Sequence, residues 1–136
     1  MRTTRSFANC PCSGRNIDKF LHAAVLTLLQ REPLHGYELV RRLADLRMFR
    51  GRGPDRTGVY RLIRQMERDG LVCSTLQPSA RGPRKRSNEL TADGERCLLR
   101  WRDTLAALQE AVGELLGKIR ERPQLATCCR RMRRNR

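Results

Sequence analysis

The sequence has no apolar run long enough to cross a membrane. Its longest run, from Ala23 to Leu29, is far shorter than the roughly 20 residues that a membrane-spanning helix needs. Arg2 and Arg5 are followed by polar residues and Pro11 instead of an apolar segment, so we expect no signal peptide and a cytoplasmic protein. Disulfides are rare in that compartment, and the six cysteines are therefore expected to be thiols or metal ligands.

Acidic residues and histidines are also scarce. Lys and Arg number 29 against 14 acidic residues, which gives a net charge of +15. Repulsion among these charges destabilises a compact chain, and a polyanionic partner would reduce that repulsion. Nucleic acid, an anionic membrane surface and an acidic protein are the candidate partners, and the membrane fits least well because the apolar runs are short. With two histidines and no visible pairing of a nucleophile with a base, we expect no enzyme site. His35, at a helix start, and His22, beside an apolar stripe, are interpreted as structural residues.

The first part of the chain carries two segments with helical periodicity. The first helix is expected to begin near Asn16, a candidate N-cap, and to stop before Pro33. The second helix is expected from Leu34 or His35 to Leu46. Its expected inward residues are Tyr37, Val40, Leu43 and Leu46.

A third helix is predicted between Asp55, its N-cap, and about Asp69, with Gly70 as its stop. Charged side chains on an amphipathic helix usually form a solvated face. Here the helix stands between a helical pair and a basic hairpin, which favours contact with the phosphates and base edges of DNA. Its buried stripe is expected to be Val59, Leu62, Ile63 and Met66, and the predicted DNA-contacting residues are Arg56, Thr57, Tyr60, Arg61, Arg64 and Arg68.

After Gly70 the apolar period changes to two, which predicts a β-hairpin. Its strands are expected at Leu71 to Leu76 and at Arg86 to Leu90, joined by a loop with prolines and a glycine. Basic residues gather at or near the tip, so we predict a wing that contacts the DNA backbone or minor groove. These residues are Arg81, Arg84, Lys85 and Arg86.

A long fourth helix is predicted after Thr91, which we expect to be its cap. Apolar residues step by three and four along it, the spacing of a coiled-coil seam, and a helix with one such seam needs a partner. The simplest partner is a second copy of the chain, which predicts a homodimer. The predicted interface residues are Leu98, Trp101, Leu105, Leu108, Val112, Leu115 and Ile119.

These elements predict a mainly α fold with a small β-hairpin, a winged helix-turn-helix followed by a long C-terminal dimerisation helix. The expected divisions are a flexible N-terminal arm at 1–15 with a Cys-x-Cys pair, a DNA-binding domain at 16–90, a dimerisation helix at 91–122 and a basic Cys-Cys tail at 123–136. In this order of elements the third helix fits the major groove, where an arginine fork can pair with guanine.

The cysteines fall into two kinds. Cys73 and Cys97, on a strand and a helix, are expected to be small buried hydrophobic residues. The pairs at the two chain ends could converge into a thiolate site for zinc, copper(I), an iron-sulfur cluster or a soft toxic metal. Exposed thiols or reversibly oxidised thiols are the alternatives, and no other cofactor is expected. The end cysteines are Cys10, Cys12, Cys128 and Cys129.

Four short motifs occur in a specific order between Phe20 and Gly94. They are Leu34-His35-Gly36-Tyr37-Glu38-Leu39, Gly58-Val59-Tyr60-Arg61-Leu62, Met66-Glu67-Arg68-Asp69-Gly70-Leu71-Val72 and Leu90-Thr91-Ala92-Asp93-Gly94. Together they resemble the signature of PadR-type transcriptional regulators. One departure stands out, because the family usually carries aromatic residues on the returning wing strand where this chain has Ser87-Asn88-Glu89.

The resemblance implies a winged-helix repressor that dimerises through its C-terminal helix and leaves DNA when an effector binds. It implies DNA contacts by Thr57, Tyr60, Arg61 and Arg64, and it places Trp101 at the dimer interface, where a planar apolar effector could bind. We therefore expect a sequence-specific regulator of double-stranded DNA, released by an effector or by thiol or metal chemistry.

Two other functions stay open at the level of sequence. A thiol protein that binds metal or senses redox state could bind DNA only incidentally. A basic RNA-binding module is the other alternative, although the single aromatic residue on the predicted recognition face argues against it, since single-stranded RNA recognition generally uses several stacking platforms.

Overall fold

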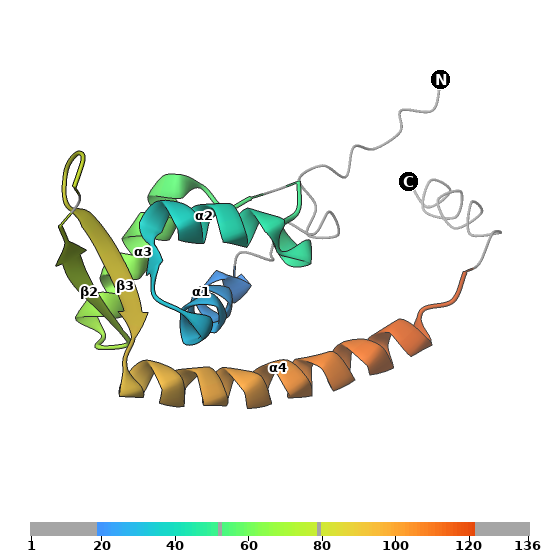
Figure 1. Ribbon diagram of the computed structural model, residues 1–136. Helices are drawn as coiled ribbons and strands as arrows, with labels where there is room; N and C mark the ends of the chain where they lie inside the picture. The colour runs from blue at the N-terminus through green and yellow to red at the C-terminus, as the bar shows by residue number, and fades with distance from the viewer. Residues whose placement is uncertain (1–18, 52, 79, 122–136) are drawn as a thin grey trace, which may run out of the picture. The chain divides into compact units, whose positions relative to one another are not determined.

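The computed structural model describes residues 19–51, 53–78 and 80–121. The chain divides into two units, Met1–Trp101 and Arg102–Arg136. Mainly helical with a small antiparallel sheet and a long C-terminal helix, the structure confirms the predicted fold class (Figure 1). The elements are α1 (Leu21–Arg31), β1 (Leu34–His35), α2 (Gly36–Asp45), the short 3-10 helix η3 (Arg47–Phe49), α3 (Arg56–Arg68), β2 (Val72–Gln77), β3 (Lys85–Leu90) and α4 (Ala92–Lys118).

The ends of α3 follow the predicted capping chemistry. The Asp55 carboxylate accepts a hydrogen bond from the backbone N–H of Gly58 (3.2 Å), which satisfies one of the free amides of the first turn. At the other end Gly70 has a φ of +76°, a conformation that costs a side-chain-bearing residue energy. Asp55 and Gly70 therefore fix both ends of the helix as the sequence predicted.

The start of α4 is also capped as predicted. The Thr91 hydroxyl accepts a hydrogen bond from the Gly94 N–H (3.0 Å) and donates one to the Gly70 carbonyl (2.6 Å). Gly94 itself packs against the Leu71 carbonyl and the Leu90 side chain, in a space that a Cβ would overfill. This close approach joins the end of α3 and the end of β3 to the start of α4.

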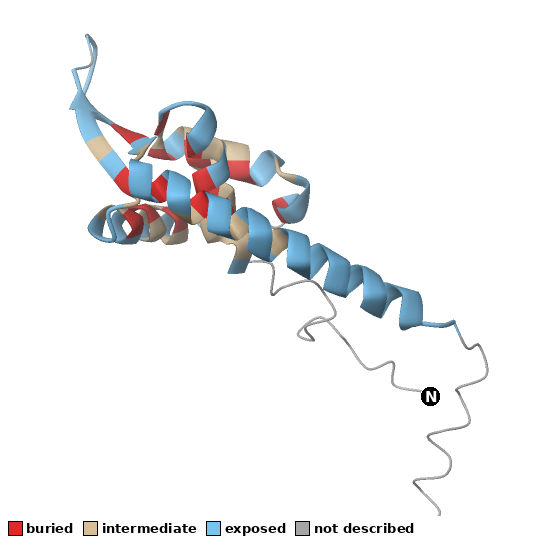
Figure 2. Ribbon diagram, turned by 90° about the horizontal axis from the view of Figure 1, so that it is seen from below, coloured by how far each residue is buried: buried red, intermediate tan, exposed pale blue. Residues whose placement is uncertain are grey.

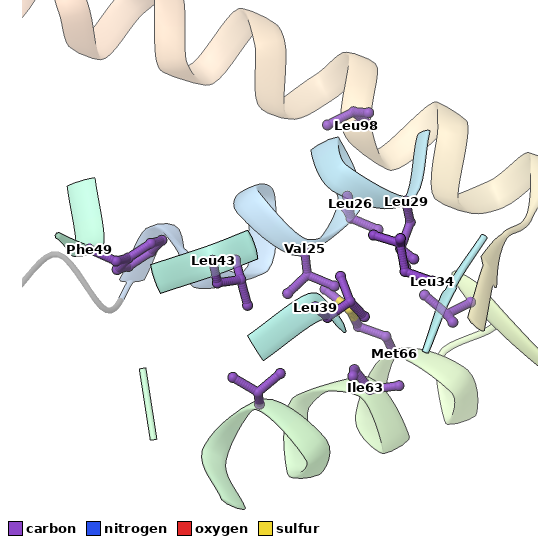
Figure 3. Close-up of a cluster of buried hydrophobic side chains, with 12 residues drawn as sticks. Val25, Leu26, Leu29, Leu34, Leu39, Leu43, Phe49, Ile63, Met66 and Leu98 are labelled. Atoms are coloured by element: carbon purple, nitrogen blue, oxygen red, sulfur yellow. The ribbon is translucent and has the colours of Figure 1, made fainter. Parts of the chain in front are cut away.

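The described hydrophobic core lies in the first unit and draws on every helix of that unit (Figure 3). Helices α1, α2 and α3 supply most of it, and β1, η3, β2 and the first turns of α4 complete it. Burial of a Leu, Val, Ile or Phe side chain contributes about 1.5–3 kcal/mol. The core residues are Val25, Leu26, Leu29, Leu34, Leu39, Leu43, Phe49, Val59, Ile63, Met66, Val72 and Leu98.

The expected inward face of α2 is partly wrong. Leu43 is buried as expected and Val40 and Leu46 are half-buried, but the buried position is Leu39, and Tyr37 is 45% exposed. Tyr37 precedes Leu39 by two residues, which is about 200° around a helix axis. The Leu39–Leu43 stripe faces the core, so the Tyr37 ring points away from it.

The expected burial of Cys73 is also wrong. On β2 the side chains alternate, with Val72 buried and Ser74 half-buried on the inner face, so Cys73 lies exposed on the outer face opposite Glu89 of β3. Cys97 on α4 is half-buried and packs against the core.

The sheet has a third strand that the sequence pattern did not predict. Leu34 and His35 form β1 and pair antiparallel with Asn88 and Ser87 of β3, which gives the order β1-β3-β2. The predicted hairpin is therefore present as β2 and β3, and β3 is the central strand. A two-residue strand is too short to show a period, so only its partner reveals it.

Ser87 and Asn88, which replace the expected aromatic residues of the wing strand, are both buried. The Asn88 amide nitrogen donates a hydrogen bond to the Leu34 carbonyl (3.1 Å), and its oxygen accepts one from the Ser74 hydroxyl (3.0 Å). One side chain thus ties β1 and β2 to the central strand by hydrogen bonds where relatives are expected to use aromatic packing. An unpaired buried polar group is costly, so these two hydrogen bonds offset the burial of the Asn88 amide.

Replacement of Asn88 by Ala is expected to lower the free energy of unfolding by about 2–3 kcal/mol. The change removes both hydrogen bonds and leaves the Leu34 carbonyl without its side-chain partner. Urea unfolding followed by circular dichroism measures the difference. Ser74→Ala is the control, because it removes one hydrogen bond and should cost clearly less; equal losses for the two variants would contradict the role given to Asn88.

Candidate nucleic-acid interface

The predicted DNA-contacting residues of α3 lie on its outward face. Arg56, Thr57, Arg61, Arg64 and Arg68 are exposed, and Tyr60 is half-buried. Val59, Ile63 and Met66 face the core from the same helix, and Leu62 is half-buried. The helix therefore presents one apolar and one cationic side, as its amphipathic pattern predicted.

The arginines of this face differ in their local partners. The Arg68 guanidinium donates to the Gln65 side-chain oxygen (2.9 Å), and the Gln65 amide donates to Asp69 (3.0 Å), so Arg68 belongs to a polar cluster at the end of α3. Across residues 19–51, 53–78 and 80–121, neither Arg61 nor Arg64 forms an ion pair or a side-chain hydrogen bond. Their charges are available to an external anion.

The basic residues of the wing point in two directions. Arg81 and Arg84 lie exposed in the loop before β3, in which Gly82 has a φ of +113°. Lys85 and Arg86 begin β3 and lean back toward the helices. The Lys85 ammonium lies 5.4 Å from the centroid of the Tyr37 ring, and the Arg86 guanidinium lies 3.9 Å from the Glu67 carboxylate of α3.

A cavity of about 550 Å³ opens between the start of α2, the outward side of α3 and the base of the wing. We call it the wing pocket. Arg64, Lys85 and Arg86 contribute three cations and Glu67 one carboxylate, so its lining carries a net positive charge. Its lining residues are His35, Gly36, Tyr37, Tyr60, Ile63, Arg64, Glu67, Ser74, Lys85, Arg86 and Asn88.

Tyr37 and His35 belong to this surface, although the sequence pattern does not show it. The Tyr37 ring stacks on the His35 ring at a centroid distance of 5.7 Å and an interplanar angle of 10°. His35 Nδ1–H donates to the Arg86 carbonyl (3.2 Å), and the His35 backbone N–H donates to the Glu38 carboxylate (3.3 Å). His35 therefore has the structural role expected of it. The adjacent Gly36 is the signal that was available, since it marks a place of close packing.

Gly36 allows α2 and α3 to approach closely. A Cβ built on Gly36 would lie 2.8 Å from Cζ of the Tyr60 ring, closer than side-chain atoms approach one another. Tyr60 is thereby held between α3 and the first turn of α2, and its position at the wing pocket is set by packing.

The predicted dimer residues divide between the two units. Leu98 is buried in the core of the first unit, and Trp101 is half-buried there. In the second unit Leu105 is half-buried, while Leu108, Val112, Leu115 and Ile119 are 40%, 59%, 63% and 66% exposed in the single chain. Figure 2 shows this later part of α4 as exposed.

Trp101 has a partner inside its own chain. Its indole Nε1–H donates to His22 Nδ1 on α1 (3.0 Å), and the two rings lie 5.9 Å apart. Burial lowers the pKa of His22, and the nearby Asp69 carboxylate opposes this shift. The imidazole nitrogen can accept this hydrogen bond only while it carries no proton.

The four end cysteines lie outside the described residues. Within the described ranges, no group of three or more His, Cys, Asp or Glu side chains could hold a metal ion. The thiolate site therefore stays a prediction. Among the described helices none has the length and apolar character needed to span a bilayer.

Comparison with known proteins gives a consistent result. The family model described as the transcriptional regulator PadR-like family matches residues 25–100. A PadR family transcriptional regulator from Eggerthella lenta is 30% identical, with 76% of this chain and 88% of that chain covered and a TM-score of 0.66. No curated protein matches the sequence significantly.

Two more distant structures share the fold. A PadR-like transcriptional regulator from Bacillus cereus is 23% identical over 74% of this chain and 94% of that chain, with a TM-score of 0.64. A putative transcriptional regulator from Thermoplasma acidophilum is 22% identical over 78% and 99% of the two chains, with a TM-score of 0.66.

The pKa of His22, which burial lowers, predicts a pH dependence of stability. Folding lowers the pKa of His22 below its ordinary 6.5. The contribution of neutral His22 to the free energy of unfolding is therefore fully present above pH 6.5, and it is lost as the pH falls from 6.5 through the lowered pKa. Urea unfolding from about pH 7.5 to about pH 5 should show a steeper loss for the native chain than for His22→Gln, which can accept the bond without titrating. If the free energy of unfolding fell equally with pH in both chains, folding would not lower the pKa of His22.

Proposed function

Because the chain belongs to the PadR-like family of transcriptional regulators, we propose that it is a homodimeric, sequence-specific DNA-binding repressor. Helix α3 reads base edges in the major groove, and the wing contacts the neighbouring backbone or minor groove. The observation that carries the proposal is the cationic side of α3, where Arg61 and Arg64 are exposed and have no ion-pair partner in the described ranges. The proposal assigns no catalytic reaction to the chain.

The charge arrangement supports a duplex partner. An arginine fork can pair bidentately with guanine in the major groove, which an α-helix fits. The apolar side of α3 is fixed in the core by Val59, Ile63 and Met66, so the helix offers its arginines from a rigid support. Such a support holds the contacting side chains in register with the base edges.

The homodimer is supported by the exposed apolar residues of α4 and by Ile119, which follows directly after it. Leu108, Val112, Leu115 and Ile119 follow coiled-coil spacing and are largely exposed in the single chain. Burial of each such side chain against a second copy would contribute about 1.5–3 kcal/mol. Two copies would then present two α3 helices to half-sites roughly 34–36 Å apart, one helical turn of DNA.

Release from DNA is proposed to depend on an effector or on thiol or metal chemistry. Trp101 is the candidate residue for a planar apolar effector bound between the two copies; within one chain its indole Nε1–H donates to His22 Nδ1. The end cysteines Cys10, Cys12, Cys128 and Cys129 are the candidates for the thiol route.

Selection of bound duplexes from a random pool at physiological salt tests the function. We expect an inverted repeat with its half-sites one helical turn apart, because two symmetric copies read two symmetric sites. A parallel selection with structured RNA is the control. Enrichment of RNA, or of no duplex sequence at all, would overturn the proposal.

Neutralisation of Arg61 and Arg64 together, as Arg61→Gln and Arg64→Gln, should weaken binding to the selected duplex. Each lost base contact is expected to cost about 1–3 kcal/mol, and each lost phosphate contact should lower the salt slope of log K by about 0.9. Fluorescence anisotropy at several salt concentrations measures both quantities. Arg100→Gln with Arg120→Gln removes the same charge from exposed positions elsewhere; if this control weakened binding equally, α3 would have no special role.

A further inference from the structure

The wing pocket brings Arg64 of α3 together with Lys85 and Arg86 of the wing, residues that the proposed function assigns to two separate contacts. It lies between these two elements and is lined by both, with three cations against the single Glu67 carboxylate. Glu67 faces Arg86 at 3.9 Å, which leaves Arg64 and Lys85 without a described carboxylate partner. The pocket is therefore suited to an anion.

The position of the pocket identifies which anion this is, given the proposed function. In a DNA duplex one sugar-phosphate strand separates the major groove from the adjacent minor groove. If α3 occupies the major groove and the wing reaches the neighbouring one, that strand has to pass between α3 and β3. The wing pocket lies at this crossing, so the nearest anion is a phosphodiester of the DNA backbone.

Tyr37 and Lys85 are arranged to meet it. The Tyr37 ring is 45% exposed and lies between the His35 ring, at 5.7 Å, and the Lys85 ammonium, at 5.4 Å. His35 is held by its bond to the Arg86 carbonyl, and the base of the wing by Asn88, so both walls of the pocket are fixed before any ligand binds. No described group accepts a hydrogen bond from the Tyr37 hydroxyl.

We propose that the wing pocket binds one phosphodiester of the DNA strand between the two grooves, with the Tyr37 hydroxyl as hydrogen-bond donor and the Lys85 ammonium as the paired charge. This inference rests on the proposed function. It adds Tyr37, a residue that a helical pattern assigns to the core, to the DNA-contacting surface. Contacts of this kind fix the register of a protein on the duplex and carry no sequence information.

Two substitutions separate the two contributions. Tyr37→Phe keeps the ring stack and removes only the hydroxyl, so affinity should fall about ten-fold per site while the salt slope stays unchanged. Lys85→Met keeps the length of the side chain and removes its charge, so affinity should fall and the salt slope of log K should decrease by about 0.9 per site. Lys118→Met is the matched control, since Lys118 lies on α4 beside Glu114 and outside the pocket.

Neutral DNA phosphates locate the contact. Each duplex carries a methylphosphonate in place of one phosphate. At one position per half-site, this replacement should weaken binding by the native chain and should not weaken binding by Lys85→Met any further. The inference would be overturned if both variants had the affinity and salt slope of the native chain, or if no phosphate showed an effect that depends on Lys85. Either result would leave the proposed function standing. Failure of the native full-length chain to bind any selected duplex would instead overturn the proposed function.

Discussion

The pairing of Leu34 with Asn88 is the interaction on which the proposed DNA-contacting surface depends. It joins the turn before α2 to the central strand of the sheet, and the Asn88 amide extends the connection to β2 through Ser74. The wing is thereby fixed to the helices at its base, while α3 is fixed through the core. A buried polar network whose members are paired rigidifies the base of the wing relative to the start of α2.

Local chemistry made much of the fold predictable from sequence. Asp55, Gly70 and Thr91 act within a few residues of the helix ends that they define, so a linear pattern reveals them. Strand β1 could not be predicted, because its two residues form a strand only through β3, more than fifty positions away. Tyr37 was misassigned for a related reason, since both Tyr37 and Leu39 fit a helical stripe and only the location of the core decides between them.

The candidate site was predictable only in part. The exposed arginines of α3 follow from the amphipathic pattern of one helix, and their positions agree with it. The wing pocket draws on segments around His35, Tyr60 and Lys85 that are far apart in the chain, and the contacts that shape it join side chains from different elements. These residues have no regular spacing in the sequence, so the sequence alone does not show that they lie together.

The contact of Gly36 with Tyr60 has a consequence for how sequences of this kind can diverge. The Tyr60 ring occupies the space that a Cβ on residue 36 would need. Substitutions at positions 36 and 60 are therefore not independent. A homologue that acquires alanine at the first place needs a smaller ring or an aliphatic residue at the second, or a wider separation of the two helices. We therefore expect this pair to appear as correlated exchanges in an alignment, a record of steric exclusion preserved across lineages.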